Sequence, residues 1–332
     1  MQTPLDIDYE DNYNRFANGL QFARLIGDHM NTFKKAVASA ALISVTLSLA
    51  ACSAGAPKTA DESYDIVASF YPMYVLTLNI AGGIDGVTVS SMSDPNMGCI
   101  HDHVFSTEDL KQLEGADVFV ENGLDLEVFN DEILAAYPDL DIIDASANVT
   151  DAPADEEEVN GHVWTSIDDY ELQIKQVSAE LQKLDPAHAD QYKANADAYI
   201  AKIKDVDKKI KDIVDNKKRD RLIFADKMPM QYFMDYYKLK VSAAFDGCST
   251  EVDPSAKTVA YLQNKVKEEK IPVILYIELN PGTVANTIAT ETGTKSMRIQ
   301  TLHNVSLDDF NNGETWVSLM TRNIDVLKAA LQ

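Results

Sequence analysis

The chain has 332 residues, and its 53 acidic against 29 basic side chains give a formal net charge of -24. A surface of that charge repels phosphate backbones, which argues against nucleic acid as a partner and leaves cations as an acceptable one. The length is sufficient for two domains of ordinary size, each with its own core, and excludes a single small domain.

The first part of the chain is predicted to lie outside the folded body. Residues 1–29 are polar and acidic. A signal peptide is not normally preceded by such a stretch, so we expect a non-native extension and a translation start at Met30. Residues 53–63 are small and polar, which is typical of a flexible tether between a membrane anchor and a folded domain.

An export signal is predicted over residues 30–52. Lys34 and Lys35 precede an apolar run at 36–51, which is shorter than the roughly 20 residues that a bilayer-spanning helix needs. Small residues precede Cys52, and this pattern resembles the lipobox of bacterial lipoproteins. We therefore expect cleavage before Cys52, lipidation of its thiol and an extracytoplasmic protein anchored to the cell membrane. A small apolar residue within the signal is the alternative reading of Cys52.

Short β-rich runs then alternate with helical patterns in an N-terminal lobe predicted over residues 64–165. The expected strands are 65–70, 87–91, 116–120 and 142–143, and the expected helices begin near Pro72 and cover 106–113 and 127–137. This alternation argues for a parallel sheet covered by helices.

Residues 166–217 lack strand patterns and are predicted to form a long linking helix. Its break is expected at Asp185-Pro186, because proline disfavours helix at the residue before it. The charges of the second piece are expected to form a solvated face, and His188 is expected at the surface.

The alternation resumes in a C-terminal lobe predicted over residues 218–332. Its expected strands are 222–224, 240–245, 273–277 and 296–301, with helices at 232–237 and 255–269, after Pro281 and from Thr315. The predicted fold class is therefore α/β, with two lobes that each hold a mostly parallel sheet flanked by helices, joined by one long linking helix.

Several metal-binding side chains follow predicted strands. Ligands bind at the carboxyl ends of the strands in open α/β sheets. The candidates at such positions are His101, Asp226, Glu278 and His303, and His162 directly precedes the linking region. Neutral imidazole is the commonest metal ligand in proteins, so one ion could be held between the lobes. Any single histidine among the six of the chain could instead be an ordinary hydrogen-bonded or surface residue.

At these residues the chain resembles the extracytoplasmic solute-binding lipoproteins of bacterial zinc and manganese ABC transporters. The resemblance covers about residues 64–332. Its marks are His101-Asp102 ahead of residues 106–117, His162-Val163-Trp164, Asp185-Pro186 with Tyr192 and Asn195, and Glu291-Thr292-Gly293. It implies His101 and His162 as metal ligands, and a protein that captures an ion between its lobes and delivers it to a membrane permease. We also expect a monomer.

The C-terminal lobe departs from the family pattern. Where the family usually has histidine or glutamate after the first strand of this lobe, the chain offers Asp226, and His303 stands where the family generally has an aspartate. The expected ligand set is thus His101, His162, His303 and Asp226. His103 is expected to orient the site or to serve as a substitute ligand. Glu278 resembles a family acid that supports the site, and a structural role is the alternative.

Three imidazoles and a carboxylate favour zinc, with manganese as the second choice because its sites tend to carry more carboxylates. Two cysteines outside the signal, Cys99 and Cys248, could form a disulfide, remain reduced or supply a thiolate ligand. An exported zinc hydrolase with Glu278 or Glu251 as its base is one alternative function, although the sequence has no His-Glu-x-x-His helix. A surface adhesin stabilised by the metal is the other.

Overall fold

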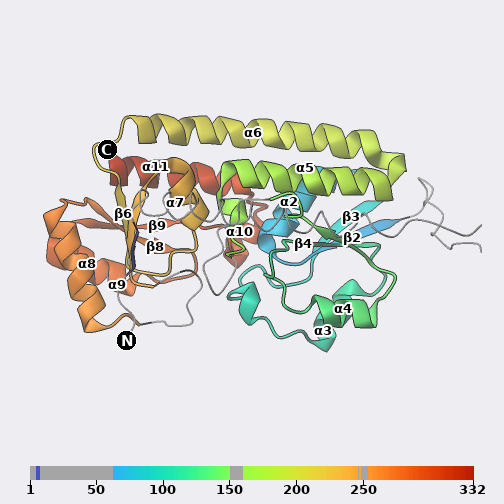
Figure 1. The fold of residues 1–332 in the computed structure, drawn as a ribbon, viewed down its shortest axis with the longest axis horizontal. Helices are drawn as coiled ribbons and strands as arrows, with labels where there is room; N and C mark the ends of the chain where they lie inside the picture. Colours follow the sequence, from blue (N-terminus) through green and yellow to red (C-terminus); the bar gives the residue numbers. More distant parts are fainter. Residues whose placement is uncertain (1–4, 8–62, 150–159, 246, 248–252) are drawn as a thin grey trace, which may run out of the picture.

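The computed structural model describes residues 5–7, 63–149, 160–245, 247 and 253–332, which form two α/β lobes beneath a pair of long helices (Figure 1). The predicted fold class is confirmed. Several predictions lie outside the described residues: the signal peptide, the translation start at Met30, the lipidation of Cys52 and the place of Cys248. No helix within the described residues is long and apolar enough to cross a membrane.

The N-terminal lobe contains a four-stranded parallel sheet in the order β3-β2-β4-β5. Its elements are β2 (Tyr64–Ala68), α2 (Tyr71–Ala81), β3 (Val87–Ser91), the 3-10 turn η1 (Ile100–Asp102), α3 (Thr107–Leu113), β4 (Val118–Glu121), α4 (Asn130–Ala136) and β5 (Asp141–Asp144). The central strands β2 and β4 are almost wholly buried, as their apolar sequences require of strands covered on both faces.

Helix α2 lies between this sheet and the long helices. Pro72 occupies its first turn, where the missing backbone N–H carries no penalty. Met73, Leu76 and Ile80 are completely buried. Burial of each such side chain stabilises the fold by about 1.5–3 kcal/mol. Because α2 starts directly after β2, its N-terminal residues lie near the carboxyl ends of the strands.

The linking region is a helical hairpin in which the second helix is the long one (Figure 1). Its elements are the 3-10 turn η2 (Val163–Thr165), α5 (Ile167–Leu184), the 3-10 turn η3 (Pro186–His188) and α6 (Ala189–Asp215). The helix breaks at Asp185-Pro186, as expected. Helix α5 leads away from the centre of the molecule, and α6 returns over both lobes, packing on α2 and on the C-terminal helix α11.

Buried hydrogen bonds fix the turn between these helices. The Asp185 Oδ2 atom accepts from Nδ1 of His188 and from the Tyr192 hydroxyl, each at 2.7 Å. His188 is only 8 % exposed, so its expected surface position is wrong: the buried carboxylate needs its donor. The Asn195 amide donates to the Ile80 carbonyl at 2.9 Å and ties α6 to the end of α2. Asp185, Tyr192 and Asn195, which carry part of the family resemblance, therefore stabilise the helical hairpin rather than bind a ligand.

The C-terminal lobe contains a five-stranded sheet in the order β1-β7-β6-β8-β9. Its elements are β1 (Leu5–Ile7), β6 (Arg221–Phe224), α7 (Gln231–Tyr237), β7 (Lys240–Ala243), α8 (Ala256–Glu268), β8 (Val273–Ile277), α9 (Thr283–Thr292), β9 (Lys295–Ile299), α10 (Leu307–Asn311) and α11 (Trp316–Leu331). Strands β6 to β9 are parallel, whereas β1 pairs antiparallel with β7 and covers an edge that would otherwise be open. Sequence analysis did not predict β1, and it was wrong to place these three residues outside the folded body, because they pair with β7.

Candidate metal centre

Three histidines meet between the two lobes. His101 lies in η1, in the connection after β3, His162 directly precedes η2, and His303 follows β9. The ring centroids of His101 and His162 are 5.8 Å apart, and those of His162 and His303 are 5.1 Å apart. His162 is therefore the central member of the cluster, with one neighbour from each lobe.

The surroundings of His162 favour its neutral form. The Oδ1 atom of Asn160 lies 2.7 Å from the ring Nδ1 and accepts from the backbone N of His162 at 3.1 Å. A proton on Nδ1 donated to Asn160 places the lone pair on Nε2, which is the arrangement of a metal-ligating imidazole. Burial, and then the neighbouring His303, hold the pKa of His162 well below its ordinary value.

Trp164 joins the two sides of the cluster. Its ring lies 5.1 Å from the His162 ring and 5.5 Å from the His303 ring, and Phe70 packs edge-on against both Trp164 and His303. The indole Nε1 donates to the Thr301 carbonyl at 3.3 Å, while the Trp164 carbonyl accepts from Nε1 of Trp316 at 3.2 Å. The His-x-Trp element therefore connects its own histidine to the chain that carries His303.

Glu278 holds the loop that carries His303. Its carboxylate accepts from the backbone N of Thr301 at 2.8 Å, from the Thr301 hydroxyl and from the backbone N of Asn304 at 3.4 Å. Burial raises the pKa of Glu278, and these hydrogen bonds oppose the rise. The side chain thus fixes the backbone on either side of His303.

Asp226 connects the ends of two strands of the C-terminal sheet. Its Oδ1 accepts from the backbone N of Lys227 at 2.8 Å and its Oδ2 from the backbone N of Ile277 at 3.0 Å. Burial raises its pKa, opposed by these hydrogen bonds. Asp226 and His303 both line a cavity of about 430 Å³ at the carboxyl ends of the strands. Each carboxylate oxygen of Asp226 therefore already has a backbone donor.

Two further residues lie beside His101. The Sγ atom of Cys99 is 2.8 Å from the ring Nδ1 of His101, a contact that sequence analysis did not predict. His103 points elsewhere: its Nε2 is 3.1 Å from Oδ2 of Asp109, and its ring packs against Phe129. Asp109 also completes the capping box of α3. His103 thus connects the His101 loop to the start of α3.

Among the described side chains, no group of three or more histidines, cysteines and acids is arranged to hold an ion as it stands. Zinc–nitrogen bonds are about 2.0–2.1 Å long. The observed centroid distances of 5.1 and 5.8 Å are compatible with two such bonds to one ion, so the ring nitrogens have to turn toward a common point rather than the rings approach one another.

Two α/β lobes spanned by a long helix, with imidazoles from both lobes between them, define the class of metal-ion solute-binding proteins. The profile of the family described as "Zinc-uptake complex component A periplasmic" (ZnuA) matches residues 66–330. The chain belongs to this family, which confirms the expected family and its role as the solute-binding component of zinc uptake. The family is one of transport components rather than of enzymes.

Individual proteins similar to this chain also carry names that refer to zinc or metal. The high-affinity zinc uptake system protein ZnuA of Bacillus subtilis is 28% identical over 322 residues, which cover 90% of this chain and 98% of that protein. The structure of the metal-dependent lipoprotein YcdH of Bacillus subtilis is 27% identical with a TM-score of 0.72, and the match covers 81% of this chain and 100% of that one. The Zn(II)-bound ZnuA-like domain of Streptococcus pneumoniae AdcA is 26% identical with a TM-score of 0.70, over 81% of this chain and 99% of that one.

Proposed function

We propose that this chain captures Zn²⁺ between its lobes with His101, His162 and His303 as ligands and delivers the ion to the permease of an ABC transporter. The observation that carries the proposal is the meeting of these three imidazoles, two from the N-terminal lobe or its exit and one from the C-terminal lobe. Burial and the neighbouring His303 lower the pKa of His162, which favours the neutral imidazole that binds metal. The nitrogen donors favour zinc over manganese, magnesium or calcium.

Asp226 is the proposed fourth ligand. It lies on the wall of the cavity that His303 also lines. Its oxygens are held by the backbone of Lys227 and Ile277, and a carboxylate oxygen has a second lone pair available for an ion. We expect the ring nitrogens of His101, His162 and His303 to turn toward a common point when the ion binds, and Asp226 to complete the tetrahedron.

The ion in this proposal is cargo and not the cofactor of a hydrolase. A hydrolase would need a general base beside the metal-bound water. Glu278, the described candidate for that base, is buried and directs its oxygens at Thr301 and Asn304. Residue 251, the other candidate, lies outside the described residues. The contacts of Glu278 therefore favour support of the His303 loop over catalysis.

The protein is further proposed to be a lipoprotein anchored through Cys52. The basic start of the signal, its apolar run and the small residues before Cys52 support this membrane-anchored location. A mass measurement on protein from membranes tests it: we expect a diacylglyceryl mass on a chain beginning at Cys52. A chain that keeps residues 30–51 would contradict it.

Zinc titration with elemental analysis tests the ligand set. Wild type is expected to bind one Zn²⁺. The His162→Ala variant is expected to lose more than about 100-fold in affinity, beyond the 10–100-fold typical of residues that only support a ligand. Lys193→Ala is the matched control, because Lys193 forms a solvent-exposed ion pair with Asp197 on α6. Unchanged stoichiometry and affinity in His162→Ala would refute the site.

A further inference from the structure

The segment between β9 and α11, residues 300–315, carries His303 and contacts both lobes. It belongs to the C-terminal lobe by chain connection. Nevertheless the backbone N of Val305 donates to the carbonyl of Pro95 at 2.9 Å, and the ring of Phe310 lies 5.4 Å from that of Tyr74 on α2. We call residues 300–315 the β9–α11 segment. His303 therefore lies in a segment that contacts both lobes.

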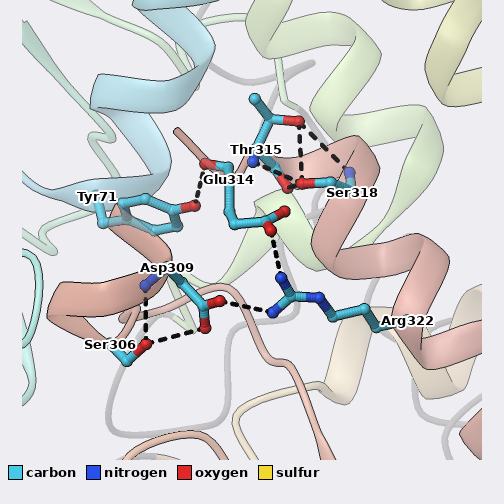
Figure 2. Close-up of polar contacts among 7 residues, drawn as sticks. All are labelled: Tyr71, Ser306, Asp309, Glu314, Thr315, Ser318 and Arg322. Atoms are coloured by element: carbon cyan, nitrogen blue, oxygen red, sulfur yellow. Dashed lines mark hydrogen bonds and ion pairs between the residues drawn. The ribbon is translucent and has the colours of Figure 1, made fainter. Parts of the chain in front are cut away.

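A single guanidinium group on α11 holds two carboxylates of this segment (Figure 2). The Nη1 atom of Arg322 donates to Oδ1 of Asp309 at 2.7 Å, and its Nη2 donates to Glu314 Oε1. Asp309 in turn accepts from the Ser306 hydroxyl at 2.9 Å, and Ser306 caps α10. Arg322 thus fixes the segment near the middle and at its far end at once. A planar fork with several donors holds both carboxylates in a fixed geometry, whereas the compact charge of a lysine would hold them less precisely.

Glu314 is also held from the opposite lobe. The hydroxyl of Tyr71, a buried residue on α2, donates to the Glu314 carbonyl at 3.0 Å. The next residue, Thr315, begins α11 through a capping box with Ser318. The side chain of Glu314 is therefore tied to the C-terminal lobe and its backbone to the N-terminal lobe, as Figure 2 shows.

The ion pairs of Arg322 with Asp309 and Glu314 are partly exposed, so their loss should affect the position of the segment more than the stability of the fold. The Arg322 side chain is 44 % exposed and those of Asp309 and Glu314 are 22 % exposed. Ion pairs with such access to solvent contribute little to global stability. Burial raises the pKa of Asp309, but the hydrogen bonds from Arg322 and Ser306 outweigh it and leave the pKa below its ordinary value. The carboxylate therefore stays charged and available to Arg322 at neutral pH.

We propose that Arg322 is a positioning residue for zinc: by holding Asp309 and Glu314 it fixes the β9–α11 segment, and with it His303, against His162. Tyr71 is its counterpart on the N-terminal lobe. Loss of either anchor lets the segment shift, so the imidazole of His303 leaves the ion more often and zinc dissociates faster. This role rests on the proposed function.

The test compares Arg322→Ala, Arg322→Lys and Tyr71→Phe with wild type and with Lys193→Ala in the full chain. Zinc dissociation into excess chelator is followed by stopped flow, Co²⁺ absorption reports the ligand set, and thermal unfolding of the metal-free protein reports stability.

We expect zinc to dissociate from Arg322→Ala about tenfold faster than from wild type, as for residues that orient metal ligands. Its Co²⁺ spectrum should change, Arg322→Lys should recover part of both effects, and Tyr71→Phe should show a smaller increase. Metal-free stability should stay close to that of Lys193→Ala.

Two results would overturn this role while leaving the proposed function intact. One is an unchanged dissociation rate in Arg322→Ala. The other is a faster rate that comes with a matching loss of metal-free stability and no recovery in Arg322→Lys. Wild-type protein that binds no zinc would instead overturn the proposed function and this role together.

Discussion

The two lobes hold their histidines in different ways. His162 is fixed by residues two positions away on either side, through the hydrogen bonds of Asn160 and the ring of Trp164. His303 is fixed from far along the chain, by the buried carboxylate of Glu278 behind its loop. A short motif is therefore enough to orient His162, while the orientation of His303 depends on a distant residue of the C-terminal lobe.

Replacement of Trp164 is expected to have the largest effect, because its ring packs against both His162 and His303. The residue is completely buried. We expect Trp164→Ala to lower the free energy of unfolding by about 3–5 kcal/mol, through lost packing and a cavity between the lobes. Denaturant unfolding measures the effect, with the exposed Val128→Ala as control. A loss below about 1 kcal/mol would mean that each lobe holds its histidine independently.

A buried acid at the end of strand β4, Glu121, is expected to make the stability of the N-terminal lobe depend on pH. The N-terminal lobe buries Glu121 beside Glu127, and burial, then the neighbouring Glu127, raises the pKa of Glu121 to about 8. The folded chain therefore binds this proton up to a higher pH than the unfolded chain, whose ordinary pKa is 4.5. By linkage, stability falls as pH rises through that window, by on the order of 1–3 kcal/mol from this group.

We expect Glu121→Gln to flatten this dependence, since a neutral amide has no proton to lose. Urea unfolding of the metal-free protein between about pH 5 and pH 8 measures it. The exposed Glu108→Gln serves as control, because its side chain is 69% exposed. Parallel pH profiles for wild type and Glu121→Gln would show that the N-terminal lobe does not keep a protonated carboxyl at this place.

The smallest expected effect concerns the relative movement of the two halves. Helix α6 (Ala189–Asp215) packs against α2 of one lobe and α11 of the other, so it resists a wide hinge motion. Solution scattering of metal-free and zinc-loaded protein is expected to show a change in radius of gyration below about 1 Å, as a loop shift or a small rotation would give. A large compaction on zinc binding would contradict a stiff connection.

Much of this architecture could be predicted from residues that act locally. The strand and helix alternation gave the two lobes, because apolar runs and caps act within a few residues. The break at Asp185-Pro186 also follows from the backbone of two neighbours. Strand-end positions placed His101 and His303 near the cleft, because parallel strands end at a common edge of the sheet.

The remainder depends on contacts between distant parts of the chain. The burial of His188 follows from the lone pairs of Asp185, which a pattern of charges does not show. Pairing of β1 with β7 is a tertiary contact between three residues and a distant edge. The contact of Cys99 with His101 depends on the turn η1, and the pairing of Arg322 with its two carboxylates depends on how α11 packs.

The placement of the tryptophans has an experimental consequence. The chain contains two, and both are buried at the junction of the lobes, where Nε1 of Trp316 donates to the Trp164 carbonyl. Trp164 lies within 5.5 Å, ring centroid to ring centroid, of His162 and His303. Tryptophan fluorescence, excited selectively over that of the 14 tyrosines, therefore comes from the junction of the lobes, and Trp164 contributes the part that originates beside His162 and His303. The molecule carries its own optical probe of ion capture and release.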